Sequence, residues 1–534
     1  MKRILINLTI GILSIVLINS SLSAQVLNEN TFKFGRTLGL IDAFYVDTAN
    51  LNNLTEKAIV EILRSLDPHS SYISAKDVKE MNDPLNGNFD GIGIHFNILH
   101  DSIVVLEAIA NGPSEKAGIV AGDRIITIND EKVAGIKITT GGVRSRLMGP
   151  KGTKVNVSIF RKGEKGLSTF TIIRDKIPIT SIDAAYMIDK ETGYIKLNKF
   201  AATTEKEFSD ALLGLQNSIP KNIILDLRDN PGGYMLAAVG IVNQFLEGQK
   251  LVVYMQGRKT PREEFKSTGN GTLTKTRLVV LTDEGSASSS EILAGAIQDW
   301  DRGVIIGRRT FGKGLVQNGF FLTDGSQIRL TIARYYTPTG RSIQSPYNEG
   351  YDKYMQNFVK RFSDGELMNA DSIHFPDSLK FYTNFNRRPV YGGGGIMPDV
   401  FVAADTANYS DYYRDLLRKG VFFTYTLDYS DKNRTRLTSS FKSFDDYKEK
   451  FEFSDADIKM FTKMGEDAGV KYNEKQFAIS RDPMLKYLKA LVANYIWQPT
   501  EYFRIMNEGD KVIEKALKVL SDGNSYSKIL GNQK

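Results

Sequence analysis

Between residues 190 and 345, short apolar runs alternate with helical segments, and this rhythm restricts the fold more than any other feature of the sequence. The apolar runs cover 194–197, 222–227, 278–282 and 304–306, and the helical segments cover 205–215, 235–245 and 289–299. Strands that alternate with helices are typical of an α/β sheet. The pattern therefore predicts an α/β core, which we place at residues 179–400.

A β-rich segment precedes this core. Runs of strand-forming residues at 103–106, 124–128 and 155–160 are separated by turn signals, of which Gly149-Pro150-Lys151-Gly152 is an example. Residues 86–178 are therefore predicted to form a compact β-rich module.

The flanking regions have a different pattern. Residues 25–85 are predicted to be helical, and the apolar spacing in 51–66 indicates a helix that ends at Asp67-Pro68. Residues 346–390 are rich in loop-forming residues, and 401–534 are polar, rich in tyrosine and mostly helical in pattern. No internal repeat is visible. The function of the C-terminal extension cannot be read from the sequence.

The first 24 residues have the three parts of a secretory signal. Lys2 and Arg3 precede an apolar run at 4–18, and small residues follow at 20–24. Cleavage after Ser23 or after Ala24 is consistent with the pattern. An uncleaved anchor and a buried N-terminal helix are the alternatives, but the basic start and short apolar run favour export to a bacterial periplasm or cell envelope.

Composition excludes several classes of chemistry. The chain has 534 residues, too many for one core, so we expect several domains. It has no cysteine, which excludes disulfides, a cysteine nucleophile and thiolate metal sites. None of its four histidines forms an H-E-x-x-H pattern, and the net charge of +7 is scattered along the chain. We therefore expect no metal, no cofactor and no nucleic-acid partner.

One serine is well placed for catalysis. Ser288 follows the apolar run 278–282 and precedes the helix 289–299, so its hydroxyl would lie beside free backbone N–H groups that can stabilise an oxyanion. The structural alternative is a capping box, because Glu291 follows three residues later.

A serine nucleophile needs a base, and Lys313 is the candidate. Gly312 and Gly314 on either side allow close approach of its backbone to another element. Burial lowers the pKa of a lysine and so favours the neutral form that can accept a proton. Gln317, four residues later, could hold the amine. The alternatives are a surface lysine and a phosphate loop, but Gly314 stands where such a loop needs Ser or Thr.

A third motif, Asp226–Gly233, closes the run 222–227. Its paired glycines, Gly232 and Gly233, could direct N–H groups into a cleft and supply a second oxyanion donor. A plain tight turn is the alternative.

Together these motifs resemble the carboxyl-terminal processing peptidases, also called tail-specific proteases, over residues 30–400. The shared motifs are Leu66–Tyr72, Gly91–Ile94, Ala117-Gly118, Gly122-Asp123, Gly149–Val155, Asn230–Gly233, Gly285–Ile292, Thr310–Gly314 and Pro398-Asp399. The resemblance implies a multidomain α/β fold, with a crotonase-like, ClpP-related peptidase core and an inserted PDZ domain in the β-rich segment.

The resemblance also implies residue roles. Ser288 would be the nucleophile, Lys313 the base and Gln317 the residue that positions the lysine. The backbone N–H groups of Ser289 and of Gly232 or Gly233 would form the oxyanion hole, with Gly232 slightly preferred. Glu291 and Asp299 would support the site, and for Asp299 the alternative is a surface acid at the end of the helix. The PDZ loop formed by Gly91, Ile92, Gly93 and Ile94 would capture a terminal carboxylate.

One position departs from the family pattern. Many members carry an arginine before the Pro-Lys-Gly-Thr turn, where it can link PDZ docking to activation, but this chain has Met148. Arg144 or Arg146 could substitute for it.

We therefore predict an exported serine endopeptidase that docks accessible apolar C-termini of proteins or peptides and cleaves through an acyl-enzyme. The competing hypothesis is a catalytically silent PDZ scaffold or periplasmic chaperone. An adaptor or activator protein and a homo-oligomer are both compatible with the sequence.

Overall fold

The computed structural model describes residues 29–215 and 219–531, so the predicted signal segment lies outside the described residues. The chain forms two compact units, and the boundary between them falls after Leu66. The first unit contains helices α2 (Glu29–Phe44) and α3 (Leu51–Arg64). The side chain of Asn50 caps α3 by accepting a hydrogen bond from the N–H of Asn53. No helix in the described part is both long and apolar enough to cross a membrane.

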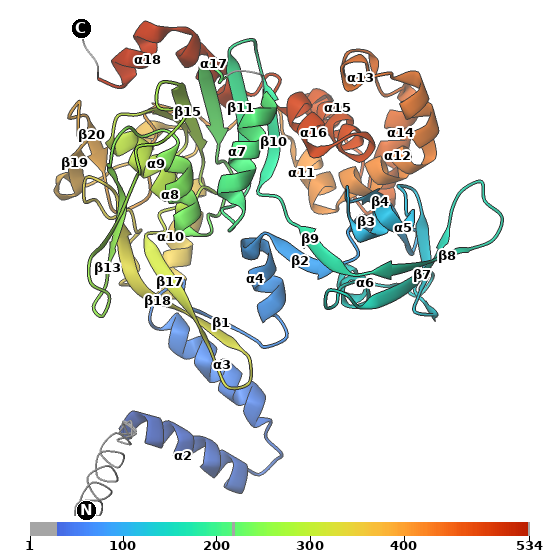
Figure 1. The fold of residues 1–534 in the computed structure, drawn as a ribbon, viewed down its shortest axis with the longest axis horizontal. Coiled ribbons are helices and arrows are strands. Elements are labelled where there is room, and N and C mark those ends of the chain that lie inside the picture. The colour runs from blue at the N-terminus through green and yellow to red at the C-terminus, as the bar shows by residue number, and fades with distance from the viewer. Residues whose placement is uncertain (1–28, 216–218, 532–534) are drawn as a thin grey trace, which may run out of the picture. The chain divides into compact units, whose positions relative to one another are not determined.

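The second unit is built on a six-stranded sheet (Figure 1). In spatial order its strands are β10 (Ile182–Met187), β11 (Thr192–Leu197), β12 (Asn222–Asp226), β15 (Arg277–Thr282), β16 (Val304–Gly307) and β21 (Val400–Phe401). The strands from β11 to β21 are parallel and β10 is antiparallel. The predicted α/β core is therefore present, and the predicted strands in it agree with the structure.

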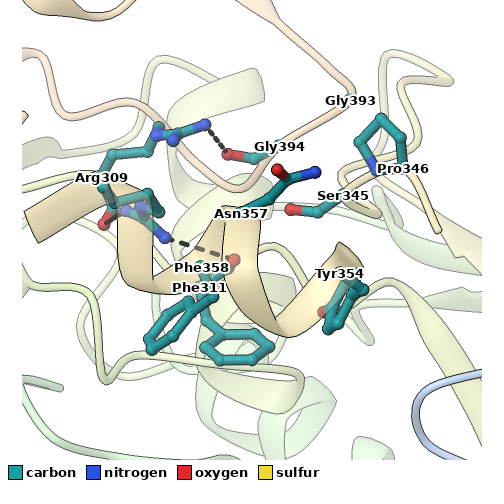
Figure 2. Close-up of a pocket in the computed structure, with 10 residues that line it drawn as sticks. Arg309, Phe311, Ser345, Pro346, Tyr354, Asn357, Phe358, Gly393 and Gly394 are labelled. Atoms are coloured by element: carbon teal, nitrogen blue, oxygen red, sulfur yellow. Dashed lines mark hydrogen bonds between the residues drawn. The ribbon is translucent and has the colours of Figure 1, made fainter. Parts of the chain in front are cut away.

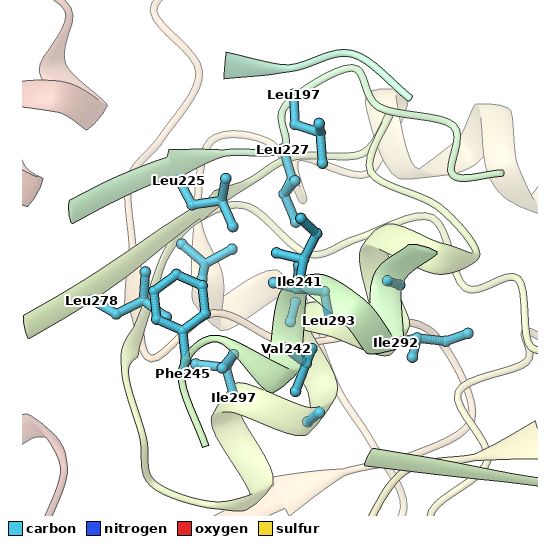
Figure 3. Packing of buried hydrophobic residues seen from close by; sticks show 14 of the residues in the cluster. Leu197, Leu225, Leu227, Ile241, Val242, Phe245, Leu278, Ile292, Leu293 and Ile297 are labelled. Atoms are coloured by element: carbon cyan, nitrogen blue, oxygen red, sulfur yellow. The ribbon is translucent and has the colours of Figure 1, made fainter. Parts of the chain in front are cut away.

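Both faces of this sheet are buried. On one face pack α7 (Thr204–Leu215), α8 (Met235–Asn243) and α9 (Ser289–Asp299). Figure 3 shows Leu225 and Leu278 from the strands near Ile241 and Ile297 from the helices and near Phe245, which follows α8. The other face is covered by α17 (Lys511–Ser521) and α18 (Gly523–Ile529). The end of the C-terminal extension therefore completes the core, which the sequence did not indicate.

A second sheet carries part of the candidate site. It contains β1 (Ser71–Ile73), β13 (Leu251–Gln256), β14 (Glu263–Lys266), β17 (Leu315–Phe321) and β18 (Gln327–Tyr336). The long strand β18 pairs with β17 along its length and with β1 near its start. Strand β1 and the following helix α4 (Val78–Asn86) lie in a region predicted to be helical throughout, so the prediction was wrong for β1.

The β-rich module is connected to the core by the antiparallel pair β2 (Asn88–Gly91) and β9 (Asp175–Pro178). Its sheet contains β3 (Ile94–Leu99), β4 (Ser102–Ala108), β5 (Arg124–Ile128), β6 (Glu131–Lys132), β7 (Lys154–Phe160) and β8 (Ser168–Ile173). Helices α5 (Pro113–Ala117) and α6 (Thr140–Leu147) complete the module, and residues of α6 pack in its apolar core with those of the sheet.

The region 346–390 is less irregular than predicted. It contains α10 (Tyr351–Ser363), two 3₁₀ turns (Ala370–Ser372 and Asp377–Leu379) and the pair β19 (Lys380–Tyr382) and β20 (Pro389–Tyr391). Helix α10 buries only Tyr354 and Arg361. Its apolar residues Tyr354, Met355, Phe358, Val359 and Phe362 recur at helical spacing, so the sequence carried a signal for this helix that the prediction of a loop-rich region missed.

The helices between the core and the last two helices form a domain of their own, rich in buried tyrosine and phenylalanine. They are α11 (Asp411–Arg418), α12 (Val421–Ser440), α13 (Phe444–Lys450), α14 (Asp455–Asp467), α15 (Glu474–Ile496) and α16 (Pro499–Met506). This domain contacts the β-rich module, where Arg124 pairs with Asp431 at 2.7 Å and Leu427 packs against Leu99 and Val104.

Candidate active site

Ser288 lies at the turn between β15 and α9, as the sequence predicted. Its φ is +54°, a left-handed conformation that is strained for a residue with a side chain and is typical of functional turns. Ser288 is half-buried and lines a cavity of about 610 Å³. The turn is held by hydrogen bonds from the N–H of Ala287 to the carbonyl of Asn230 and from the N–H of Phe311 to the carbonyl of Ser286.

The neighbouring serines are engaged elsewhere. The hydroxyls of Ser286, Ser289 and Ser290 donate to the carbonyl oxygens of Leu227, Gly233 and Asn230, at 2.8, 2.9 and 2.9 Å. All three serines are buried. Ser288 is therefore the serine of this segment that is best placed to meet a substrate.

The fully buried carboxylate of Glu291 connects the two loops of the site. Its Oε2 accepts hydrogen bonds from the backbone N–H groups of Ser288 and Lys313, both at 2.8 Å. Its Oε1 accepts from the N–H of Gly312 at 2.7 Å and from the hydroxyl of Thr310 at 2.5 Å. Burial raises the pKa of Glu291 to about 7, although these four donors oppose the shift. Glu291 is thus more than the second half of a helix cap.

Tyr335 makes a second link between the same residues. Its buried hydroxyl donates to the carbonyl oxygen of Lys313 and lies 3.1 Å from that of Ser288. The backbones of Ser288 and Lys313 are therefore tied together at their N–H groups by Glu291 and at their carbonyls by Tyr335. The sequence carried no signal for Tyr335, because it lies on β18, outside the recognised motifs.

Lys313 is half-buried, and burial lowers the pKa of its amine. The charge of Arg329 acts in the same direction, whereas the carboxylates of Glu291 and Asp67 oppose it. The net effect favours a neutral amine at lower pH than in a solvated lysine, as a general base requires. Gln317 lies on β17, where its Nε2 donates to Thr331 Oγ1 at 3.1 Å, and it lines the same cavity as Ser288.

The turn Asn230–Gly233 lies directly against Ser288. A Cβ on Gly232 would come within 2.8 Å of both the Cβ of Ser288 and the backbone nitrogen of Ser289, and Gly232 has a φ of +95°, so a side chain is excluded there. The N–H of Gly232 donates to the side chain of Asn230 at 2.9 Å. The N–H groups of Gly233 and Ser289 have no hydrogen-bond partner among the described residues. The slight preference for Gly232 as oxyanion donor is therefore not supported, and Gly233 is the better candidate.

A smaller cavity of about 180 Å³ lies beside Phe311, on the loop that carries Lys313 (Figure 2). Arg309 and Arg361 line it, and both form ion pairs with Glu366. Arg361 also donates to the carbonyl oxygens of Arg309 and Thr310, at 2.8 and 2.9 Å. The two guanidinium groups are therefore occupied by partners within the protein and stabilise the loop, so they do not form a ligand site.

Asp299 does not join the site. It is the last residue of α9, at the opposite end of the helix from Ser288, where it pairs with the buried Arg341 at 2.7 Å and accepts hydrogen bonds from Thr339. Its place in the structure is that of a buried structural acid, which balances the charge of Arg341.

The loop Gly91–Ile94 of the β-rich module has the geometry that carboxylate capture needs. The carbonyl oxygens of Ile92 and Gly93 accept from the N–H groups of Ser114 and Ile109, both at 3.0 Å. In a trans peptide the next N–H points the opposite way, so the N–H groups of Gly93 and Ile94 are directed away from those partners. Gly93 has a φ of +75°, which favours glycine.

The arginines considered as substitutes for Met148 have other partners. Arg144 donates to Glu80 of α4 at 3.0 Å, and Arg146 forms a two-point contact with Glu131 at 2.6 and 3.0 Å. Arg144 thus links α6 of the β-rich module to α4, whereas Arg146 is used within the module. Within the described ranges, no group of three histidine or acidic residues could hold a metal ion.

Comparison with known proteins identifies the parts. Residues 191–349 match peptidase family S41, residues 91–172 match a PDZ domain, and residues 412–498 match a family of unknown function. A carboxy-terminal-processing protease of Bartonella bacilliformis is 38% identical over 328 residues, which are 59% of this chain and 74% of that protein. The carboxy-terminal processing protease CtpA of Bacillus subtilis is 33% identical over 60% of this chain and 68% of its own length.

Among solved structures, a photosystem II D1 C-terminal processing protease matches with 29% identity, over 59% of this chain and 91% of that one, with a TM-score of 0.33. The extent and identity of the sequence matches assign the β-rich module as a PDZ domain and the α/β core as the peptidase. This chain belongs to the S41 family of serine peptidases, as a carboxy-terminal processing protease with a PDZ domain.

Proposed function

We propose that Ser288 is the nucleophile and Lys313 the general base of this protease. The observation that carries the proposal is the carboxylate of Glu291, which binds the backbone N–H groups of both residues at 2.8 Å and so fixes one relative to the other. Catalysis requires this kind of fixed geometry between nucleophile and base. The lowered pKa of Lys313 supports its role as the proton acceptor.

The reaction follows from these positions. The neutral amine of Lys313 takes the proton of the Ser288 hydroxyl while Oγ attacks the carbonyl carbon of the scissile peptide bond. The N–H groups of Gly233 and Ser289 stabilise the oxyanion. The protonated Lys313 then gives its proton to the leaving amine, which releases the C-terminal product and leaves an acyl-enzyme. Water, deprotonated by Lys313, then attacks the ester carbonyl, and Lys313 returns that proton to the Ser288 oxygen as it leaves, which restores Ser288 and releases the N-terminal product as a carboxylic acid.

The cavity beside Ser288 accepts the substrate in this proposal. Its walls include apolar side chains of α8, α9 and β17, among them Met235, Ile292 and Leu315. We assign the core the crotonase-like, ClpP-related arrangement, on the basis of its parallel strands with α8 and α9 on one face.

We further propose that the PDZ domain selects substrates by their C-terminal ends. Its loop presents the N–H groups of Gly93 and Ile94 for a terminal carboxylate, and the adjacent strand β3 can pair with an extended peptide. Since Met148 stands where many family members have an arginine, other contacts must couple docking to catalysis. The hydrogen bond from Arg144 to Glu80 is one such contact.

Amidation of the substrate's C-terminus is expected to lower kcat/KM by roughly 10- to 100-fold, because the carboxylate loses charge-assisted hydrogen bonds to the loop. The test compares cleavage of one unfolded protein substrate with an apolar C-terminal residue, prepared as free acid and as amide. A short peptide that spans only the cleavage site is the control, and we expect equal rates for its two forms. Equal rates for both forms of the long substrate would contradict capture by the PDZ loop.

We also propose that the protein is exported. The basic residues Lys2 and Arg3, the apolar run 4–18 and the small residues 20–24 support this. In fractionated cells, we expect the chain in the envelope fraction with Ala24 or Gln25 as its first residue, measured by mass spectrometry of the N-terminal peptide. A variant without residues 1–24 should stay in the cytosol. An intact Met1 on envelope-bound protein would indicate an uncleaved anchor instead.

A further inference from the structure

Three side chains from distant parts of the sequence form a hydrogen-bonded chain that ends at Gln317. Gln317 Nε2 donates to Thr331 Oγ1 at 3.1 Å, and Thr331 Oγ1 donates to Asp67 Oδ1 at 3.0 Å. Strand pairing brings them together: Gln317 of β17 lies opposite Thr331 of β18, and β1, which follows Asp67, also pairs with β18.

Asp67 is held as an acceptor by its own loop. Its Oδ1 accepts from the N–H groups of His69 and Ser70, both at 2.8 Å, and its Oδ2 accepts from the Ser70 hydroxyl at 2.6 Å. His69 anchors the loop further, since its ring lies edge-on to that of Tyr354 and its Nε2 is 3.1 Å from the Tyr354 hydroxyl. Asp67 is 8% exposed, so these donors take the place of water.

This arrangement decides the direction of each hydrogen bond. A carboxylate only accepts, and a threonine hydroxyl has one hydrogen, so that hydrogen goes to Asp67. Thr331 Oγ1 can then only accept from Gln317, and the group of Gln317 that faces it must be the amide nitrogen. The two ends of a glutamine amide have nearly the same shape, so its hydrogen-bond partners decide which way it lies. Gln317 Oε1 is thereby left as a hydrogen-bond acceptor on the other side of the amide.

We propose that Asp67 and Thr331 are positioning residues for catalysis: they fix the amide of Gln317 so that its Oε1 accepts a hydrogen bond from the Lys313 amine. This inference rests on the proposed roles of Lys313 and Gln317. It gives the Leu66–Tyr72 motif a task in the reaction, because Asp67 acts on the lysine through Thr331 and Gln317. A second effect of Asp67 is direct, since its negative charge opposes the lowering of the Lys313 pKa by burial.

The first test is Thr331→Val, which keeps the β-branched shape on strand β18 and removes the hydroxyl. We expect kcat to fall roughly tenfold, the value of one lost hydrogen bond, while KM for a long substrate with a free C-terminus stays unchanged. Thr331→Ser restores the hydroxyl and should recover kcat to within about twofold of wild type. If Thr331 were only structural, kcat would follow the thermal stability of each variant and would not depend on whether the hydroxyl is present.

A double-mutant cycle separates this proposal from the proposed function. If Thr331 acts through Gln317, Thr331→Val in a Gln317→Ala background has no further effect on kcat. Independent losses that multiply in the double variant would overturn the inference, as would an unchanged kcat for Thr331→Val alone. Wild-type activity of Gln317→Ala is a different result, and it would refute the role of Gln317 in the proposed function itself.

Asp67→Asn is the second variant and keeps the test decisive if Thr331→Val does not fold. Asparagine presents an amide that can donate towards Thr331, which frees the threonine hydrogen to point at Gln317 and favours the flipped amide. Because Asp67→Asn also removes the charge that raises the Lys313 pKa, kcat is compared on the high-pH plateau, where Lys313 is neutral in every variant. There we expect the same loss of kcat as for Thr331→Val, and again no loss in the Gln317→Ala background. A loss that persists in that background would contradict action through Gln317.

Discussion

Ser288→Ala is expected to reduce kcat by at least about 10⁴-fold, with little change in the affinity for substrate. In the proposed mechanism this hydroxyl forms the acyl-enzyme, and no neighbouring serine can replace it, because the hydroxyls of Ser286, Ser289 and Ser290 are directed to backbone carbonyls. The residual rate would come from the oxyanion donors and from substrate binding, as is general for nucleophile knockouts. Cleavage of a long unfolded substrate with a free C-terminus measures kcat, and the inactive variant allows its affinity to be measured without turnover.

Ser290→Ala is the matched control. It removes the same atom two residues along the chain and loses a buried hydrogen bond to Asn230. We expect it to lower the free energy of unfolding by about 1 kcal/mol and to change kcat by only a few fold. Substantial activity in Ser288→Ala, or an equal loss of activity in the two variants, would contradict the assignment of Ser288.

Local patterns in the sequence were enough for the helix that follows Ser288 and for several strands, but not for β1, nor for β17 and β18, which also carry residues of the site. The helix 289–299 and the strand 124–128 were predicted with the bounds that the structure gives. The serine and lysine motifs were found because each combines glycines with a reactive side chain at the end of an apolar run. Apolar periodicity and turn-forming residues are local properties, so they can be recognised from neighbouring residues alone.

Relations between distant segments could not be predicted in this way. Three of the four hydrogen bonds to Glu291 depend on the loop 310–313 folding back onto α9, and only the fourth, from the N–H of Ser288, belongs to the capping box that was visible locally. The place of Asp299 likewise depends on a distant residue, Arg341, with which it pairs. Helices α17 and α18 cover the core sheet, but in the chain they are separated from it by the nearly 100 residues of the helical domain. Nothing in their own sequence indicates that they return to the core.

The pH dependence of the free energy of unfolding should show the cost of burying the Lys313 amine. Because the folded state lowers the pKa of this lysine, the unfolded chain binds its proton more tightly, and folding becomes more favourable as the pH rises through the lowered pKa towards 10.5. Glu291 has the opposite sign, since its pKa rises from 4.5 to about 7 in the folded state and its contribution to stability falls over that range. Burial of the Lys313 amine and of the Glu291 carboxylate therefore both lower the stability of the fold, and the proposed mechanism requires both groups beside Ser288.

Lys313→Met should therefore be inactive and yet more resistant to unfolding than the wild type at neutral pH. We expect kcat to fall by about 10³-fold or more, because no other group described near Ser288 is placed to take its proton. The apolar methionine suits the half-buried position and removes the cost of burying an amine. Thermal unfolding at pH 7 and at pH 10 measures the second effect, and the advantage of the variant should shrink at the higher pH. A wild-type rate in Lys313→Met would refute its role as base.

The pH dependence of the wild type gives the complementary result. The rate should rise with pH, because the base works only when neutral, and the rise should occur below the usual range of a lysine, since burial lowers the pKa of Lys313. Glu291, whose pKa burial raises to about 7, must also lose its proton to accept its four donors, so it contributes to the rise as well. Arg329→Met removes the cation that helps to lower the Lys313 pKa, and it should move the rise to higher pH. Lys313→Arg is the decisive partner to these measurements: it keeps the charge but cannot be deprotonated, so it should be inactive at every pH.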